Sequence, residues 1–239
     1  MGLRHQARRG QKRASPGLLV LTGAGVPEHF MKLQILAVLA VACFVASGAG
    51  AQSLQLVNGN YPGIYCRFSG NCQVNSTEQS DSFTPTNVAA TCVLMSRSFP
   101  GTSIDTSGRY GYEYQVTINS NGQTTETNIV MVDSLTLLFG EPDYFSFAEH
   151  ASNQVWAVVA GGPAGLPPGS ASLDGKKVTI SFSPPLELQT QTDQTTNTLV
   201  FGMMSDSAAE VTTAILTGVA QDPVYGKIPF KAKLQAQTP

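Results

Sequence analysis

The chain is 239 residues long, with 14 basic and 16 acidic side chains and a formal net charge of −2. After residue 51, eight basic and fifteen acidic side chains remain, which gives a formal charge of −7. So few scattered cations exclude a nucleic-acid-binding stripe and a polybasic membrane patch, and the length suits one domain better than two.

The first 51 residues have the layout of a leader. After Met31 come a short basic head, an apolar run at 33–45 and a small-residue cleavage box at 49–51. The apolar run is shorter than the roughly 20 residues that a membrane-spanning helix needs. We therefore predict a signal peptide at 31–51 and a secreted, extracellular or periplasmic chain that starts at Gln52.

Two alternatives stay open in this region. Residues 1–30 either form a long head whose Arg8-Arg9 pair hints at twin-arginine export, or are upstream sequence translated from an early start codon. We favour the second, because the apolar residues expected soon after the pair are missing. Residues 40–43 also resemble a bacterial lipobox, which would make Cys43 a lipidated N-terminus, although the box at 49–51 fits better.

Three cysteines follow the leader, Cys66, Cys72 and Cys92. In an oxidising compartment two of them are expected to pair. A Gly-Asn turn between the first two can bring their sulfurs together, and closing this short loop would stabilise the fold by about 2 kcal/mol. We predict a Cys66–Cys72 bond with Cys92 buried or partnered with another molecule, while a longer loop through Cys92 stays open as the alternative.

The composition predicts an all-β fold, because Thr, Ser, Gln, Gly and Asn are abundant and helix formers at three-four spacing are missing. The first strands are expected at 53–57, 63–68 and 90–97. The polar segment 73–86 is expected to be a loop, and its glycosylation sequon at Asn75 is interpreted as loop composition only.

The strongest pattern in the chain lies at 110–119. Its tyrosine and aliphatic residues share one parity and its polar residues the other, which is the period of a half-buried strand. An Asn-Gly turn cluster follows at 119–122, and then an apolar run at 129–132. This order predicts a β-hairpin formed by 110–119 and 129–132.

Short strands are expected through the rest of the chain. The segment 154–160 is apolar on both faces and therefore expected to be central in a sheet. The turn Asp174-Gly175 predicts a hairpin, and the polar segment 189–198 is either an edge strand or a loop. The Ser-Pro-Pro sequence at 183–185 is expected to break the chain. Strands are also expected at 134–139, 144–148, 170–173, 177–183, 198–204, 210–218 and 226–235.

Together these elements predict one antiparallel β-sandwich, jelly-roll-like, over residues 52–239. A proline-rich loop is expected at 161–169. In the last strand, lysines alternate with apolar residues, an arrangement that protects a sheet edge from pairing with other molecules.

The sequence gives little support to catalysis. His150 is the only histidine after residue 51, and no motif supplies it with a nucleophile and an orienting acid. The best carboxylate pair, Glu141 and Asp143, has the spacing used by two-carboxylate glycosidases. Residues 144–146 occupy the positions where the sandwich-fold glucanases place a further glutamate. We predict that the protein is not an enzyme, with a secreted glycan-active hydrolase as the alternative.

Aromatic and acidic residues are the candidates for a binding site. An alternating tyrosine row is more typical of a core-facing strand than of a sugar-stacking platform. The candidates for such a platform are Trp156, Tyr110, Tyr112 and Tyr114. No cofactor or metal is predicted. A calcium site is the alternative, although no motif supports it, and its candidate ligands are Asp105, Asp133 and Asp143.

The run 199–205 leading into 211–214, together with the leader and the Thr/Ser-rich acidic body, resembles bacterial exported β-sandwich proteins of the PEP-CTERM type. Those proteins are sorted to the surface by a Pro-Glu-Pro motif, an apolar helix and a basic tail. This sequence reaches Pro239 without these features, so the resemblance does not extend to the anchor. It implies a non-enzymatic role, and we expect a binding or structural module of the envelope or exterior, with a glycan or another envelope protein as partner.

Overall fold

The computed structural model describes residues 50–122, 128–145, 154–190 and 194–239. These residues form twelve strands and one short helix, α2. The elements in chain order are β1 (Gln52–Asn60), α2 (Gly63–Phe68), β2 (Thr77–Phe83), β3 (Ala90–Pro100), β4 (Tyr110–Ser120), β5 (Ile129–Leu138), β6 (Gln154–Ala160), β7 (Ser170–Asp174), β8 (Lys177–Gln189), β9 (Thr195–Asn197), β10 (Phe201–Ser205), β11 (Glu210–Asp222) and β12 (Gly226–Thr238). The all-β prediction is confirmed.

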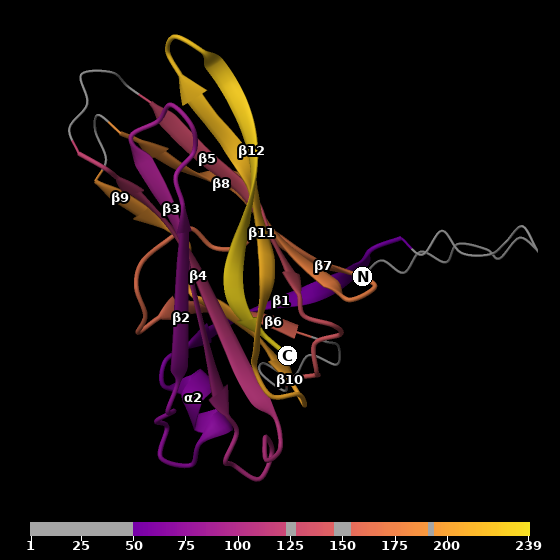
Figure 1. Cartoon of the computed structure of the whole chain (residues 1–239). Helices are drawn as coiled ribbons and strands as arrows, with labels where there is room; N and C mark the ends of the chain where they lie inside the picture. Colours follow the sequence, from indigo (N-terminus) through magenta and orange to yellow (C-terminus); the bar gives the residue numbers. More distant parts are fainter. Residues whose placement is uncertain (1–49, 123–127, 146–153, 191–193) are drawn as a thin grey trace, which may run out of the picture. The chain divides into compact units, whose positions relative to one another are not determined.

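The described strands all belong to one sheet, in the order β12-β11-β5-β8-β7-β1-β6-β10-β4-β3-β2, with β9 paired to β4 (Figure 1). Strand β1 joins the two halves of this sheet. Its residues 52–54 pair with β7 in an antiparallel ladder, and its residues 55–60 pair with β6 in a parallel one.

The sheet curls until its two edges approach each other, so that it is nearly closed into a barrel. Side chains from the β2 and β3 side bind backbone groups of the edge strand β12. The N–H of Gln235 donates to Asp81 Oδ2 at 2.7 Å, and the N–H of Gln237 donates to Ser96 Oγ at 2.9 Å. These bonds satisfy edge donors that have no ladder partner.

The interior is filled by side chains of one parity from each strand. In β5 this parity changes midway, because Val130 and Val132 point inward before Asp133, and Leu135 and Leu137 point inward after it. A register shift at Asp133 produces the change. The partner strand β8 passes through its two prolines at the same place, so the expected chain break at 183–185 is an irregularity within one strand.

The predicted hairpin is wrong in its pairing. Strand β4 lies between β3 and β10, whereas β5 lies between β11 and β8 in the other half of the sheet. The Asn-Gly turn, with Gly122 at φ +127°, ends β4 without returning the chain beside it. A local pattern thus gave the strand and its end but could not identify the partner.

Three other segments differ from expectation. Residues 63–68 form helix α2 rather than a strand, and the expected loop 73–86 contains β2. Six residues are too few to separate a period of two from the helical spacing of Ile64 and Phe68. Tyr144 and Phe145 are not in a strand, and the rest of the expected strand 144–148 lies outside the described residues.

Other predictions are confirmed. The β7–β8 hairpin forms across Asp174 and Lys177, and β6 is central between β1 and β10. Strand β12 is a sheet edge, with its lysines exposed and its alternate residues inside. Part of the polar segment 189–198 forms the short strand β9. The described part of the chain contains no helix that is both long enough and apolar enough to cross a membrane.

Candidate functional site

Four neighbouring strands place a row of residues on the outer face of the sheet. Arg97 of β3 lies opposite Glu113 of β4, Glu113 lies opposite Gly202 of β10, and Gly202 lies opposite Trp156 of β6. A Cβ atom on Gly202 would come within 2.6 Å of indole atoms of Trp156. The missing side chain therefore lets the indole lie across β10 and reach Glu113.

The carboxylate of Glu113 is 1% exposed and surrounded by donors. Its Oε2 accepts hydrogen bonds from Arg97 Nε at 2.8 Å and from the Tyr61 hydroxyl at 3.1 Å. Its Oε1 accepts one from Trp156 Nε1 at 3.4 Å. Arg97 Nη2 lies 2.5 Å from Oε2 and also donates to the hydroxyls of Tyr61 and Tyr65. Both carboxylate oxygens are thus engaged by the protein itself.

The ionisation of this cluster follows from burial and pairing. Burial raises the pKa of the Glu113 carboxyl, while the charge of Arg97 and the surrounding donors act in the opposite direction. Burial and the nearby charge of Glu113 both raise the pKa values of Tyr61 and Tyr65. Burial alone would lower the pKa of Arg97, but Glu113, Tyr61 and Tyr65 together outweigh burial and raise the pKa. The arginine stays charged and the phenols stay protonated donors.

Helix α2 and the residue before its cap cover this row from outside. Ile64 and Phe68, four residues apart, are fully buried on one side of the helix. Tyr61 and Tyr65 stack with ring centroids 4.4 Å apart, and the guanidinium carbon of Arg97 lies within 5.8 Å of both centroids. The helix therefore supplies the second layer that buries Glu113.

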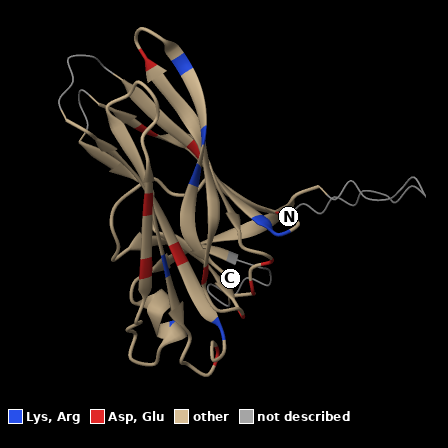
Figure 2. Cartoon of the chain, in the orientation of Figure 1, with Lys and Arg blue, Asp and Glu red and all other residues tan. Residues whose placement is uncertain are grey.

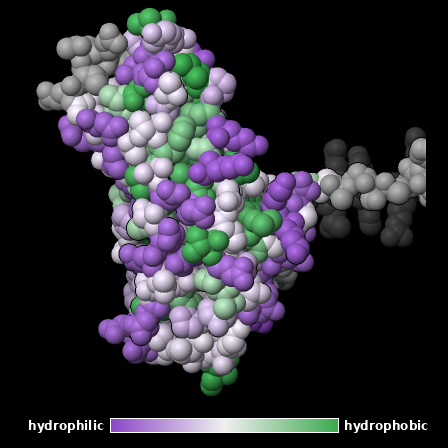
Figure 3. Space-filling view, in the orientation of Figure 1, coloured by the Kyte–Doolittle hydropathy of each residue, from purple (hydrophilic) through white to green (hydrophobic). Residues whose placement is uncertain are grey.

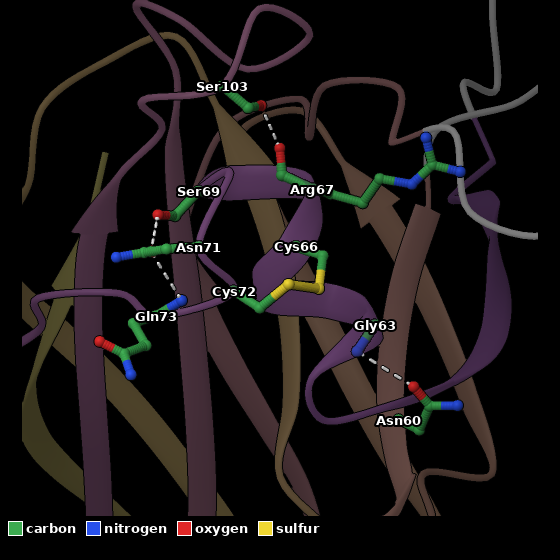
Figure 4. The surroundings of a disulfide bond; sticks show 9 residues. All are labelled: Asn60, Gly63, Cys66, Arg67, Ser69, Asn71, Cys72, Gln73 and Ser103. Carbon is green, nitrogen blue, oxygen red and sulfur yellow. Dashed lines mark hydrogen bonds between the residues drawn. A yellow bond between two sulfur atoms is a disulfide. The ribbon is translucent and has the colours of Figure 1, made fainter.

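The end of α2 is fixed on two sides. Cys66 is bonded to Cys72, and within the turn that this bond closes, the side-chain oxygen of Asn71 accepts two hydrogen bonds (Figure 4). The carbonyl oxygen of Arg67 accepts hydrogen bonds from two hydroxyl groups of the loop 101–109. The backbone that carries the Arg67 side chain is therefore held in place by these bonds.

A hollow of about 280 Å³ lies beside this braced end. Arg67 and Arg109 line it with side chains that are 46% and 43% exposed. Their nearest acids are Asp105, 3.9 Å from Arg67 Nη1, and Asp143, 3.7 Å from Arg109 Nε, both beyond hydrogen-bonding distance. Tyr144, which is 40% exposed, adds an aromatic wall. The remaining lining residues are Thr106, Phe145 and Met204.

Two further hollows differ in chemistry. One of about 390 Å³ is lined by the acids Glu141, Asp206 and Glu210 and by Lys176. Another of about 280 Å³, beyond the disulfide turn, is lined by uncharged residues. Of these three hollows, only the one beside α2 combines arginines with an exposed aromatic ring.

The candidate sugar-stacking residues do not form an exposed platform. Tyr112 and Tyr114 are buried inside the sheet, where their hydroxyls donate to the carbonyl oxygens of Ser207 and Gln237, both at 2.7 Å. Tyr110 is half-buried against the same core, and Trp156 is buried beneath α2. The core-facing interpretation of the tyrosine row is confirmed, because alternate residues of β4 point into the curled sheet.

The candidate carboxylate pair, Glu141 and Asp143, lies in the segment between β5 and β6. Asp143 faces Arg109, and its N–H donates to the carbonyl oxygen of Met204 at 2.7 Å. Neither Glu141 nor Asp143 lies on a strand. The side-chain alternation of a strand, which would point residues i and i+2 to the same side, therefore does not apply to this pair. Burial raises the pKa of Asp143, while Arg109 lowers it.

The calcium candidates are dispersed as well. Asp105 faces Arg67 and Asp133 lies at the irregularity of β5. Within the ranges that the structure describes, no three His, Cys, Asp or Glu side chains converge closely enough to hold a metal ion. His150 lies outside those ranges.

The cysteine prediction is confirmed. Cys66 and Cys72 form the disulfide, and Cys92 is a free, fully buried thiol of β3. Burial raises the pKa of Cys92 to about 12.

The residues that organise this face were missed from the sequence. Glu113 was assigned to the solvent side of a half-buried strand, although its side is covered by Tyr61, Tyr65 and α2. One feature of the sequence could have indicated that this outer face is covered. Strand β6 is apolar on both faces, which requires a second buried layer over the outer face of its neighbours.

Comparisons with protein-family models, with curated proteins and with solved structures found no match to this chain.

Proposed function

We propose that this chain is an exported, non-enzymatic binding module of the cell envelope or exterior, and that the end of the sheet that carries α2 is its recognition surface. The observation that carries this proposal is the hollow beside α2. It places two partly exposed arginines beside an exposed tyrosine ring, and the backbone that carries one of them, Arg67, is braced by a disulfide. Rigid elements that present a few polar groups around a hollow are typical of small-ligand recognition.

The buried acid supports binding over catalysis. A general acid or base must exchange a proton with a substrate at hydrogen-bonding distance. Glu113 has both oxygens engaged by Arg97, Tyr61 and Trp156, and its carboxylate is buried beneath α2. Its role is to hold β3, β4, β6 and α2 together beneath the recognition surface.

The polarity of one face of the molecule is compatible with this kind of recognition. On the face shown in Figure 3, hydrophobic side chains are scattered among hydrophilic ones. A broad apolar patch would instead favour docking of another protein. A glycan, which carries hydroxyl groups and apolar ring faces, suits a hollow with arginines, an acid and a tyrosine.

Export and fold type belong to the same proposal. The leader at 31–51 and the Cys66–Cys72 disulfide are both compatible with an oxidising compartment. We class the fold as a jelly-roll-like sandwich, because the two halves joined by β1 share one core. N-terminal sequencing of the exported protein is expected to begin at Gln52; a start before Met31 would contradict this leader.

A paired assay tests the function. The purified protein is screened on a glycan array and, in parallel, on chromogenic glycoside and ester substrates. We expect binding to a restricted set of glycans with no turnover. Turnover lost in Glu141→Gln or Asp143→Asn would establish the hydrolase alternative, and turnover lost in Glu113→Gln would place catalysis at the buried acid. A protein that neither binds nor hydrolyses any of the panel would have a structural role instead.

A further inference from the structure

The cationic residues after the leader are segregated by type. The three arginines, Arg67, Arg97 and Arg109, lie on α2, on β3 and just before β4. The five lysines lie at the β7–β8 turn and on β12 (Figure 2). In an acidic body, the arginines beside α2 are therefore a local concentration of planar, multidentate donors.

Two of these arginines are available to a ligand, and the third is not. Arg97 is held by Glu113 at 2.8 Å and by two tyrosine hydroxyls. Arg67 and Arg109 face acids at 3.9 Å and 3.7 Å, and such exposed pairs contribute little. A ligand anion can replace these long contacts at small cost.

The hollow has a fixed floor. Phe145 stacks on Phe68 with ring centroids 5.4 Å apart and lies 4.8 Å from Trp156, so it continues the buried aromatic cluster. The carbonyl oxygen of Arg109 accepts from the N–H of Gly101 at 2.7 Å. The donors are thus carried by backbone that need not reorganise on binding.

The charges select the ligand. The lining holds two arginines and one acid, Asp105, with Asp143 close to Arg109. The planar carboxylate of a sugar acid matches a guanidinium fork, and its single charge suits a lining whose two arginines are largely balanced by Asp105 and Asp143. The exposed ring of Tyr144 offers a surface for the apolar face of a sugar, and Asp105 can accept hydrogen bonds from its hydroxyl groups.

We infer that the hollow beside α2 binds a uronic acid unit of an acidic glycan, with Arg67 and Arg109 holding its carboxylate and Tyr144 lying against its ring. This inference rests on the proposed binding function and specifies its ligand. The cavity volume of about 280 Å³ limits the deeply bound part to one sugar unit.

The test uses matched ligands and matched variants. Oligosaccharides of galacturonate, glucuronate, mannuronate and guluronate are titrated calorimetrically into the purified protein, each beside its methyl ester, which keeps the ring and removes the charge. We expect at least one acid form to bind about tenfold or more tightly than its ester. Arg67→Gln and Arg109→Gln should each weaken that binding by a similar factor, and Tyr144→Ala should weaken it too. Lys227→Gln removes the same charge from β12 and should change nothing.

The possible results distinguish a wrong ligand assignment from a wrong proposed function. Equal binding of acids and esters, or of neutral or sulfated glycans in preference to uronates, would overturn the ligand assignment and leave the binding module intact. So would uronate binding that Arg67→Gln and Arg109→Gln do not alter. No binding of any uronate would also overturn it, whereas turnover of substrates would overturn the proposed function itself. Circular dichroism and thermal unfolding of each variant, expected to match the wild type, show that it folds.

Discussion

The interior of the curled sheet and the outer face beneath α2 are held together by different means. The interior is built from aliphatic and tyrosine side chains that alternate along each strand. The outer face combines an aromatic cluster with the Arg97–Glu113 pair, and its cover is supplied by residues 61–68. Burial of apolar area stabilises the first, whereas the second depends on every buried polar group having its partner.

This difference predicts different responses to mutation. An apolar interior loses stability in proportion to the volume removed. The outer face should lose much more when one partner of its ion pair is removed than when both are replaced together.

The largest effect is expected from Glu113→Ala. It leaves Arg97 buried without its carboxylate, so the free energy of unfolding should fall by about 3–5 kcal/mol. Denaturant unfolding measures it, with Thr117→Ala on the same side of β4 as the control, expected to cost much less. The double variant Arg97→Met/Glu113→Leu should recover a large part of the loss. A loss for Glu113→Ala as small as for Thr117→Ala would mean that the outer face is open to water.

Removing the disulfide should have an intermediate effect. Cys66→Ser/Cys72→Ser frees a loop whose closure stabilises the fold by about 2 kcal/mol. Because this loop braces α2 and leaves the interior untouched, protection of backbone amides from hydrogen exchange should drop in α2 and persist in β5 and β11. Uniform loss of protection would contradict the independence of the two regions.

The smallest effect concerns the interior thiol. Burial raises the pKa of Cys92 from 9.0 to about 12, so the unfolded chain releases this proton at a lower pH than the folded one. Stability from this group is therefore complete below pH 9 and is lost as pH rises toward 12, by about 1 kcal/mol at pH 10. Unfolding measured between pH 7 and 10.5 should show a shallower alkaline decline in Cys92→Ala. An identical decline in both proteins would show that Cys92 ionises as readily in the folded state.

The sequence predicted what local pattern can determine. The all-β class, the β7–β8 hairpin, the central position of β6 and the Cys66–Cys72 bond are confirmed, because each depends on neighbouring residues or on a single strand. The β4–β5 hairpin was wrong because strand pairing depends on contacts distant in sequence, which a turn cluster at 119–122 does not specify.

The site was missed for a related reason. The alternation of β4 describes its inner side correctly, but burial of its outer side depends on Tyr61 and Tyr65, about fifty residues earlier. Gly202 contributes by lacking a side chain, which no polarity pattern registers. The hollow likewise brings Arg67 together with Arg109 through the loop 101–109, whose hydroxyl groups bind the carbonyl oxygen of Arg67.

The central claim is that this end of the sheet has one structural arginine, Arg97, and two arginines that bind ligand, Arg67 and Arg109, and arginine side-chain NMR tests it most directly. The Nε–Hε signals of Arg67, Arg97 and Arg109 are assigned with Arg→Lys variants and followed during titration with the tightest-binding uronate oligosaccharide. The account predicts that the signals of Arg67 and Arg109 shift and saturate together, while Arg97, bonded to Glu113 at 2.8 Å, stays in place. Saturable shifts of Arg97 with Arg67 and Arg109 unchanged would contradict it.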